Sequence, residues 1–141
     1  AFLGDDLQKA FLHGHSFTGN PIGCAAAIAS LKLLEKKECQ AAIKNITKSH
    51  KIFTNSIRLF DGIKDIRQTG TILAIELKSD SSGYASNMRQ RLYQEFLKQG
   101  VLLRPLGNVI YILPPYCIQE KELNKVYEVI KSQLMQIQMQ T

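Results

Sequence analysis

The residues best suited to chemistry lie near the start of the chain, in residues 13–21 with the sequence HGHSFTGNP. Asn20 followed by Pro21 is typical of a helix start, because the asparagine side chain accepts from free N–H groups and proline has none to satisfy. Such helix ends attract anions, and Ser16 and Thr18 place two hydroxyls just before this one. The stretch predicts part of a phosphate site. The alternative is that both hydroxyls only cap the helix.

A second group of candidate residues surrounds Arg104. Pro105 follows it and favours an extended backbone at Arg104, whose guanidinium suits a carboxylate through two parallel hydrogen bonds. Tyr111 is expected on a facing strand, where it offers an apolar ring and one hydroxyl. The alternatives are a surface arginine or structural ion pair for Arg104, and core packing for Tyr111.

Other polar residues favour structural interpretations. His13 and His15 could share one strand face, but zinc sites need roughly three or four protein ligands and no third lies nearby, so no metal site is predicted. His50 falls within an apolar helical stripe and is expected to be a packed histidine. Arg67 and Glu76 are expected to form a structural ion pair.

The spacing of apolar residues predicts helices in the first half of the chain. Residues 21 to about 37 predict an alanine-rich helix. From Cys39 to Phe60 the apolar positions recur at alternating intervals of four and three, which is typical of one long amphipathic helix. Asp61 and Gly62 are expected to end it, with the glycine in the left-handed C-cap conformation.

The second half of the chain predicts short strands alternating with helices. The expected elements are strands over 63–67 and 71–77 around Gly70, a helix through Met88, Leu92 and Phe96 up to Gly100, strands over 101–104 and 109–113, and a helix through 123–134. Pro114-Pro115 should end the last strand, and the tail from Gln136 should fray. This order predicts an α/β (α+β) domain: a small sheet with helices packed on one face, preceded by a long helix.

Composition narrows the class of protein. The chain has 141 residues, 45% of them hydrophobic, which is enough for a core, and no apolar run long enough to span a membrane. Its net charge of +6 comes from lysines spread along the helices, which favours a solvated surface over a nucleic-acid footprint. The three cysteines are scattered and lack a CxxC spacing, which suits a reducing, cytoplasmic compartment. Cys24 and Cys117 are expected to be small buried residues.

Two motifs together resemble a known family. Residues 11–27 (FLHGHSFTGNPIGCAAA) and 100–116 (GVLLRPLGNVIYILPPY) are similar to segments of the class III aminotransferases, which belong to the fold type I pyridoxal-phosphate enzymes. The second motif resembles in particular the branch that acts in biotin synthesis. Residues 65–70 and 74–77 follow the same pattern, so the resemblance covers essentially the whole chain. It implies pyridoxal 5'-phosphate as cofactor, small-molecule substrates and a homodimer, with no nucleic-acid or membrane partner.

The resemblance also implies site residues. In the family, the hydroxyl at the position of Ser16 binds the cofactor phosphate across the dimer interface, and backbone groups at His15 should help. Gly14 would lie beside the substrate, where a side chain would intrude. Arg104 would bind the substrate carboxylate, and Tyr111 would point into the substrate pocket.

The resemblance does not supply a catalytic residue. The lysine that holds the cofactor in the family lies upstream of these motifs, and the context of Lys9 does not match it. We therefore expect a C-terminal fragment that is inactive alone, with residues 1–20 from the end of the large domain, 21–60 as connecting helices and 61–141 as the small C-terminal domain. The alternatives are another class III aminotransferase, acting on ornithine, 4-aminobutyrate or another ω-amine, or a non-catalytic interaction domain.

Overall fold

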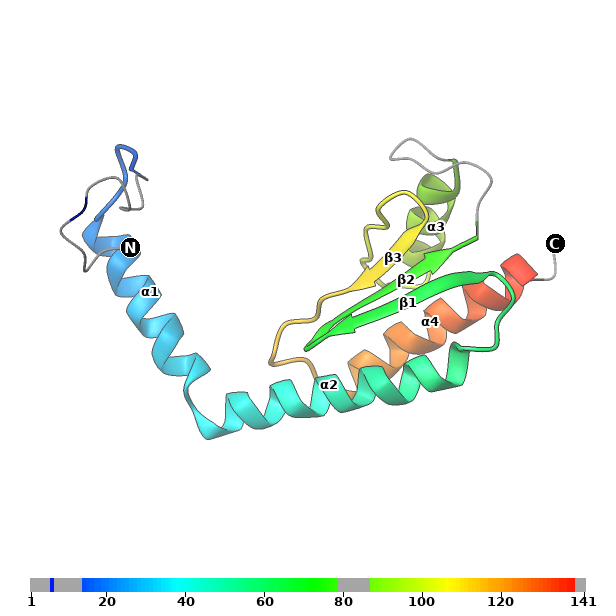
Figure 1. Cartoon of the computed structure of the whole chain (residues 1–141), viewed down its shortest axis with the longest axis horizontal. Helices are drawn as coiled ribbons and strands as arrows, with labels where there is room; N and C mark the ends of the chain where they lie inside the picture. Colours follow the sequence, from blue (N-terminus) through cyan, green and yellow to red (C-terminus); the bar gives the residue numbers. More distant parts are fainter. Residues whose placement is uncertain (1–5, 7–13, 79–86, 139–141) are drawn as a thin grey trace. The chain divides into compact units, whose positions relative to one another are not determined.

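The computed structural model describes residue 6, residues 14–78 and residues 87–138. The chain divides into two compact units, Ala1–Lys36 and Lys37–Thr141. The first contains helix α1, and the second contains the order α2, β1, β2, α3, β3, α4 (Figure 1). Lys9 and His13 lie outside the described residues. The expected division into residues 1–20, 21–60 and 61–141 as parts of a longer enzyme stays a prediction.

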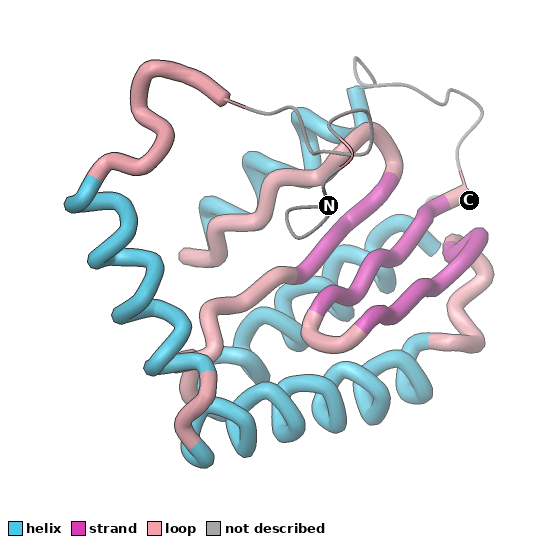
Figure 2. The backbone as a smooth tube through the Cα atoms, turned by 60° about the vertical axis from the view of Figure 1, so that its left-hand side comes forward, coloured by secondary structure: helices cyan, strands magenta, loops and turns pink. Residues whose placement is uncertain are grey.

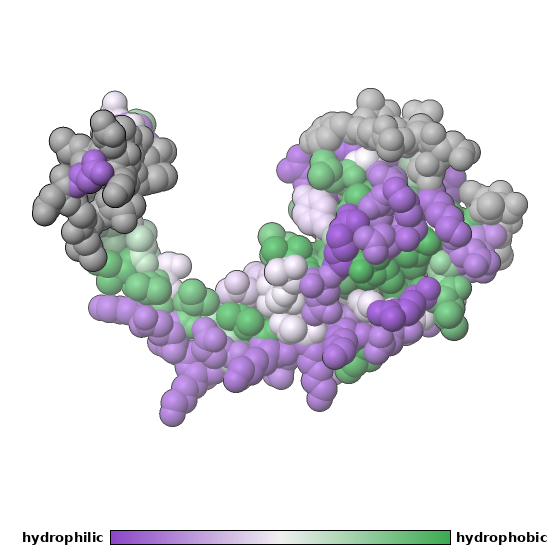
Figure 3. All heavy atoms as spheres, in the orientation of Figure 1, coloured by the Kyte–Doolittle hydropathy of each residue, from purple (hydrophilic) through white to green (hydrophobic). Residues whose placement is uncertain are grey.

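Helix α1 spans Pro21–Leu34 and begins as predicted. The side-chain oxygen of Asn20 accepts from the backbone N–H of Ile22 at 3.0 Å, and Pro21 occupies the first turn. Every residue of α1 is exposed in the part of the chain that the structure describes, including large apolar ones. Figure 3 shows these apolar side chains in green along the helix. The apolar side chains of α1 are therefore not buried by any other described residue of the chain.

Helix α2 spans Lys37–Ile57, and its apolar stripe faces the core. The predicted end at Asp61 and Gly62 is wrong: the helix stops at Ile57, and tighter turns follow, with the N–H of Phe60 donating to the carbonyl of Ile57 at 3.1 Å. Phe60 still packs against the core, which explains why the stripe continues beyond the helix. Gly62 does not adopt a positive φ, so it is not a left-handed cap. The lysines of α2 lie on its exposed face, as expected for a solvated surface (Figure 3).

The sheet consists of three antiparallel strands in the order β1 (Ile63–Thr69), β2 (Ile72–Leu77) and β3 (Val109–Ile112). The strands predicted over 63–67, 71–77 and 109–113 are confirmed, and β3 ends before Pro114. Gly70, with φ of 55°, occupies the β1–β2 turn. Side chains alternate in burial along β2 and β3, so one sheet face is covered and the other is open.

Helices cover the buried face of this sheet, as predicted. α3 spans Asn87–Lys98 and α4 spans Glu120–Gln138, and Figure 2 shows both, with α2, beside the strands. Gly100, whose φ is 72°, lies two residues beyond the end of α3, as expected for a glycine that stops a helix. The core joins residues of every element of the second unit; its fully buried members include Ile57, Leu73, Ile75, Leu77, Phe96, Ile110 and Ile130. The predicted α/β (α+β) class, with helices on one face, is confirmed.

Three further expectations are wrong. Residues 101–104 form no strand; the structure shows only an isolated bridge between Leu106 and Val109. The tail does not fray at Gln136, because α4 continues to Gln138 and Ile137 packs against the core. Cys24 and Cys117 are exposed rather than buried, since α1 is uncovered and Cys117 lies in the loop before α4. All three cysteines are free thiols.

Candidate functional site

The predicted phosphate segment folds into a compact turn before α1. Its backbone bonds to itself: the N–H of Thr18 donates to the carbonyl of His15 at 2.9 Å, and the N–H of Asn20 donates to the carbonyl of Phe17 at 3.2 Å. The N–H of His15 donates to the hydroxyl of Thr18 at 2.9 Å. Gly19 has φ of 75°, which few other residues adopt readily. Thr18 thus stabilises the turn.

Ser16 is placed differently from Thr18. It is exposed, and among the described residues neither its hydroxyl nor its backbone N–H makes a hydrogen bond that would occupy it. The N–H of His15 is already used within the turn, and its ring Nδ1 accepts from the N–H of Phe17 at 3.2 Å. The hydroxyl and the backbone N–H of Ser16 therefore remain available as donors, whereas the neighbouring groups of the turn bond to one another. This donor set fits a phosphate group, which accepts several hydrogen bonds.

Gly14 lies at the start of this turn in open surroundings. A Cβ at Gly14 would meet no described atom within 4 Å. Its lack of a side chain therefore has no cause within the described residues, and its place beside a substrate stays a prediction.

Arg104 lies in the second unit, in a shallow groove against α3. The groove is lined by Arg89, Gln90, Tyr93, Gln94, Leu102, Arg104 and Pro105. Arg104 is exposed, while Leu103 and Pro105 on either side of it are buried, so the extended backbone expected before the proline directs Arg104 outward. No ion pair of Arg104 occurs among the described residues. Its guanidinium is therefore available to an anionic group.

Tyr111 lies on the open face of the sheet. The strand register places Ala74 between Arg67 on β1 and Tyr111 on β3. Tyr111 is 38% exposed, which does not support the alternative that it packs in the core between Ile110 and Ile112. Its direction into a substrate pocket stays a prediction.

The same face carries a cluster of charges that includes the predicted pair of Arg67 and Glu76. The Arg67 guanidinium lies 2.9 Å from Glu76 and 2.7 Å from Asp65, and the Lys64 ammonium lies 2.8 Å from Glu76. Hydrogen bonds from Lys64 and then from Arg67 hold the pKa of Glu76 below its usual range. The pKa of Arg67 is raised, chiefly by its hydrogen bond to Glu76. The ion pair is confirmed, and Arg67 is committed to these carboxylates.

The structure brings only the residues of the turn together and places the other two at separate positions: Arg104 in the groove against α3 and Tyr111 on the open face of the sheet. Gly14, His15 and Ser16 lie in the turn of the first unit, and Arg104 and Tyr111 lie in the second. Among the described residues no cluster of histidine, cysteine, aspartate and glutamate could hold a metal ion. Sequence reasoning missed Arg89, because its contact with the Arg104 segment joins residues far apart in the chain and no local pattern signals it.

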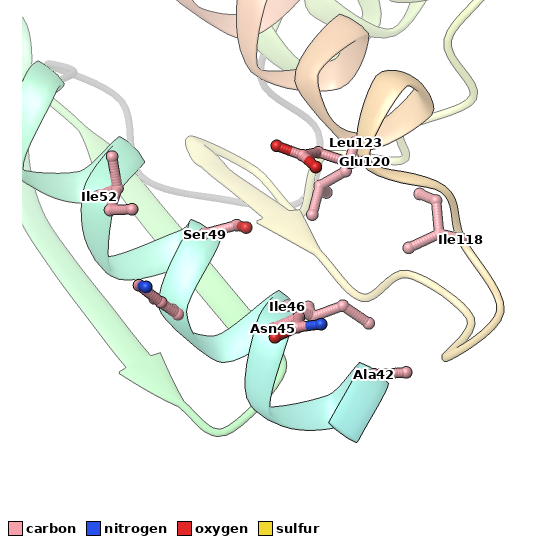
Figure 4. Close-up of a pocket in the computed structure, with 9 residues that line it drawn as sticks. Ala42, Asn45, Ile46, Ser49, Ile52, Ile118, Glu120 and Leu123 are labelled. Carbon is pink, nitrogen blue, oxygen red and sulfur yellow. The ribbon is translucent and has the colours of Figure 1, made fainter. Parts of the chain in front are cut away.

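A second hollow, of about 430 Å³, lies between α2 and the start of α4. Figure 4 shows Asn45 and Ser49 of α2 facing Glu120 and Ile118 across it. None of the predicted site residues lines this hollow. Among the helices of the described residues, none combines the length and the hydrophobicity that a membrane-spanning segment needs.

The family model and the most similar relatives that the comparisons found agree on one protein family. The family model described as "Aminotransferase class-III" matches residues 2–134. The adenosylmethionine-8-amino-7-oxononanoate aminotransferase of Synechococcus elongatus is 41% identical over 136 residues, covering 96% of this chain and 32% of that protein. The protein of the same name from Geobacter sulfurreducens is 39% identical over 130 residues, covering 88% and 29%.

Solved structures share the fold. The adenosylmethionine-8-amino-7-oxononanoate aminotransferase of Methanocaldococcus jannaschii matches with a TM-score of 0.71 and 32% identity, covering 86% of this chain and 30% of that one. The acetylornithine aminotransferase of Elizabethkingia anophelis matches with a TM-score of 0.72 and 25% identity, covering 91% and 33%. The chain thus spans about a third of the length of the relatives it matches.

Proposed function

Because the chain belongs to the class III aminotransferases, we propose that it forms the C-terminal part of an enzyme that moves an amino group from S-adenosylmethionine to 8-amino-7-oxononanoate. The product would be 7,8-diaminononanoate, a biotin precursor. The observation that carries this proposal is the 41% identity to a relative of that name, which extends over 96% of the chain. The similarity to an acetylornithine aminotransferase keeps a different ω-amine substrate as the second candidate.

The cofactor of this family is pyridoxal 5'-phosphate, which supplies an electron sink for amino-group transfer when bound. Ser16 would hold its phosphate through the hydroxyl and the backbone N–H that the turn leaves unused. His15 and Thr18 would keep the turn in shape through their mutual hydrogen bonds. We propose that this turn serves the cofactor of the second subunit of a homodimer.

The second unit would bind the keto acid. Arg104 would hold the carboxylate, since its guanidinium is exposed and has no acidic partner among the described residues. The exposed ring of Tyr111 would contact the alkyl chain. Gly14 would leave room for the substrate beside the cofactor. The free cysteines are compatible with a cytoplasmic enzyme.

The 141-residue chain alone would not catalyse the reaction. No lysine in it has the context of the family's cofactor-binding lysine. A transaminase assay on this polypeptide should give no turnover above background. Turnover above background would contradict this part of the proposal.

Kinetics of the full-length enzyme test the substrate assignment. Arg104→Ala should raise the KM for 8-amino-7-oxononanoate by about ten- to a hundredfold, because hydrogen bonds to a charged group are lost. The KM for S-adenosylmethionine should change far less. Equal effects on both substrates would argue against the carboxylate role, and preferential turnover of ornithine or another ω-amine would favour the second candidate.

A further inference from the structure

The backbone that carries Arg104 is held at its two ends but not by a sheet. At one end the N–H of Val101 donates to the carbonyl of Phe96 at 2.9 Å. At the other, Leu106 and Val109 exchange two backbone hydrogen bonds, of 2.8 and 3.0 Å. Among the described residues no backbone–backbone hydrogen bond joins residues 102–105 to another segment. The direction of the Arg104 side chain therefore depends on contacts other than strand pairing.

One such contact comes from α3. Arg89, in the first turn of that helix, donates from Nε to the carbonyl oxygen of Pro105 at 3.2 Å, in a partly buried position. Arg89 and Arg104 line the same groove. Figure 1 shows the connection that leads to β3 beside α3. A side chain of α3 thus replaces the strand partner that residues 101–104 lack.

The chemistry of proline makes this contact effective at Arg104. The pyrrolidine ring fixes φ of Pro105, so ψ is the only free rotation between the Pro105 carbonyl and the peptide group that joins it to Arg104. Anchoring the Pro105 carbonyl therefore restricts the backbone at Arg104 as well. We propose that Arg89 is a positioning residue, which holds the Arg104–Pro105 segment so that the Arg104 guanidinium meets the substrate carboxylate. Its effect on catalysis rests on the proposed function of Arg104.

The kinetic test uses the full-length enzyme with Arg89→Met and a matched control, Arg91→Met. Arg91 lies on α3 but does not line the groove, and its replacement removes the same charge. Arg89→Met should raise the KM for the keto acid about five- to tenfold, the size expected for one lost hydrogen bond, with kcat and the KM for S-adenosylmethionine nearly unchanged. Arg89→Lys, which keeps a donor and the charge, should fall between Arg89→Met and the parent. An Arg89→Met enzyme that behaves like Arg91→Met would overturn the proposal.

A double variant separates positioning from direct binding. If Arg89 acts through Arg104, adding Arg89→Met to Arg104→Ala should not raise the keto-acid KM further. A full additional increase would show that Arg89 binds the substrate itself, and would overturn the positioning role.

Hydrogen exchange tests the proposal without relying on activity. The backbone amides of Val101 and Leu106, which donate hydrogen bonds at the two ends of the segment, should exchange several-fold faster in Arg89→Met, but not in Arg91→Met. Unchanged exchange would overturn the proposal whatever Arg104 binds. Faster exchange together with an Arg104→Ala enzyme of unchanged keto-acid KM would retain the structural anchoring, but refute both the carboxylate role and the effect of Arg89 on catalysis.

Discussion

The imidazole of His50 and the hydroxyl of Tyr127 form a buried hydrogen bond of 2.7 Å that joins α2 to α4. The Nε2 atom of the same ring lies 3.0 Å from the carbonyl oxygen of Thr71, which can only accept, so Nε2 carries the proton and Nδ1 accepts from Tyr127. Burial lowers the pKa of His50 and raises that of Tyr127. One neutral histidine thereby connects two helices and the β1–β2 turn.

This arrangement predicts a pH-dependent stability. Because native His50 resists protonation, the unfolded chain takes up the proton first, and the free energy of unfolding should fall as the pH drops below the ordinary value of 6.5. For a single proton the slope cannot exceed about 1.4 kcal/mol per pH unit, and it should vanish once the lowered native pKa is passed. Urea unfolding of the 141-residue chain between about pH 5 and about pH 7.5 measures it. His50→Gln should remove this slope.

Tyr127→Phe serves as the companion variant. It removes the donor to Nδ1 but keeps the histidine, so it should lower the free energy of unfolding by about 1–3 kcal/mol. The slope below pH 6.5 should persist in this variant. If the free energy of unfolding depended on pH equally steeply in the parent, in Tyr127→Phe and in His50→Gln, the slope would come from groups other than His50.

A cofactor-binding prediction follows from the unused donors of Ser16. In the full-length enzyme Ser16→Ala should weaken retention of pyridoxal phosphate about tenfold, since one hydrogen bond to a charged group is lost. Equilibrium dialysis or the cofactor's absorbance reports the affinity. Ser30→Ala, an exposed serine of α1, is the matched control. If Ser16→Ala bound pyridoxal phosphate as tightly as Ser30→Ala, Ser16 would not be a phosphate ligand.

A stability prediction concerns Gly107, between Arg104 and Tyr111. Its φ of 62° lies in the left-handed region, within the turn closed by Leu106 and Val109. Gly107→Ala should therefore lower the free energy of unfolding by about 1–2 kcal/mol. Gly62→Ala is the control, because Gly62 has no positive φ and a Cβ there meets Ile137 at an ordinary 3.4 Å. Equal losses in both variants would show that the turn conformation is not the cause.

The charge cluster on the open sheet face, formed by Lys64, Asp65, Arg67 and Glu76, should contribute to the stability of the fold in a way that is lost in acid. Because the pKa of Glu76 is lowered in the folded chain, its stabilisation is present above the ordinary carboxylate range and is lost as the pH falls through the native value. Glu76→Gln should therefore flatten the acid limb of a plot of Tm against pH. Glu95→Gln, which removes an exposed pair with Lys98 on α3, should leave that limb in place. Identical curves for Glu76→Gln and the parent would contradict the role of the cluster.

Local patterns were sufficient for much of the fold. The N-cap at Asn20, the β1–β2 turn at Gly70 and the stop of α3 just before Gly100 depend on neighbouring residues, and each was predicted correctly. The end of α2 was not, because Phe60 packs against the core from a turn and so continues the apolar spacing beyond the helix. An apolar residue at the helical spacing, such as Phe60, can therefore pack in the core without belonging to the helix.

The environment of Arg104 could not be predicted, because it depends on a contact across the fold. Residues 101–103 form a short apolar run that is typical of a strand, yet they pair with no described strand, and the carbonyl of Pro105 accepts a hydrogen bond from Arg89 of α3. Likewise, an apolar helix such as α1 is usually covered, but what covers it is not a property of its own sequence. The predicted site residues were chosen by resemblance and local chemistry, while the groups that position them are remote in sequence.

The order of strands in the sheet bears on how this part of the chain reaches its native state. Each strand pairs with a neighbour in the sequence, and β1 and β2 are joined by a turn of two residues, Gly70 and Thr71. Closing so short a loop costs little chain entropy, so the hairpin can nucleate early. The connection through α3 to β3 and the docking of α4 are slower, longer-range steps. The buried hydrogen bonds of His50 to Thr71 and Tyr127 can form only at the end of folding, because they require both the hairpin and the docked helix α4.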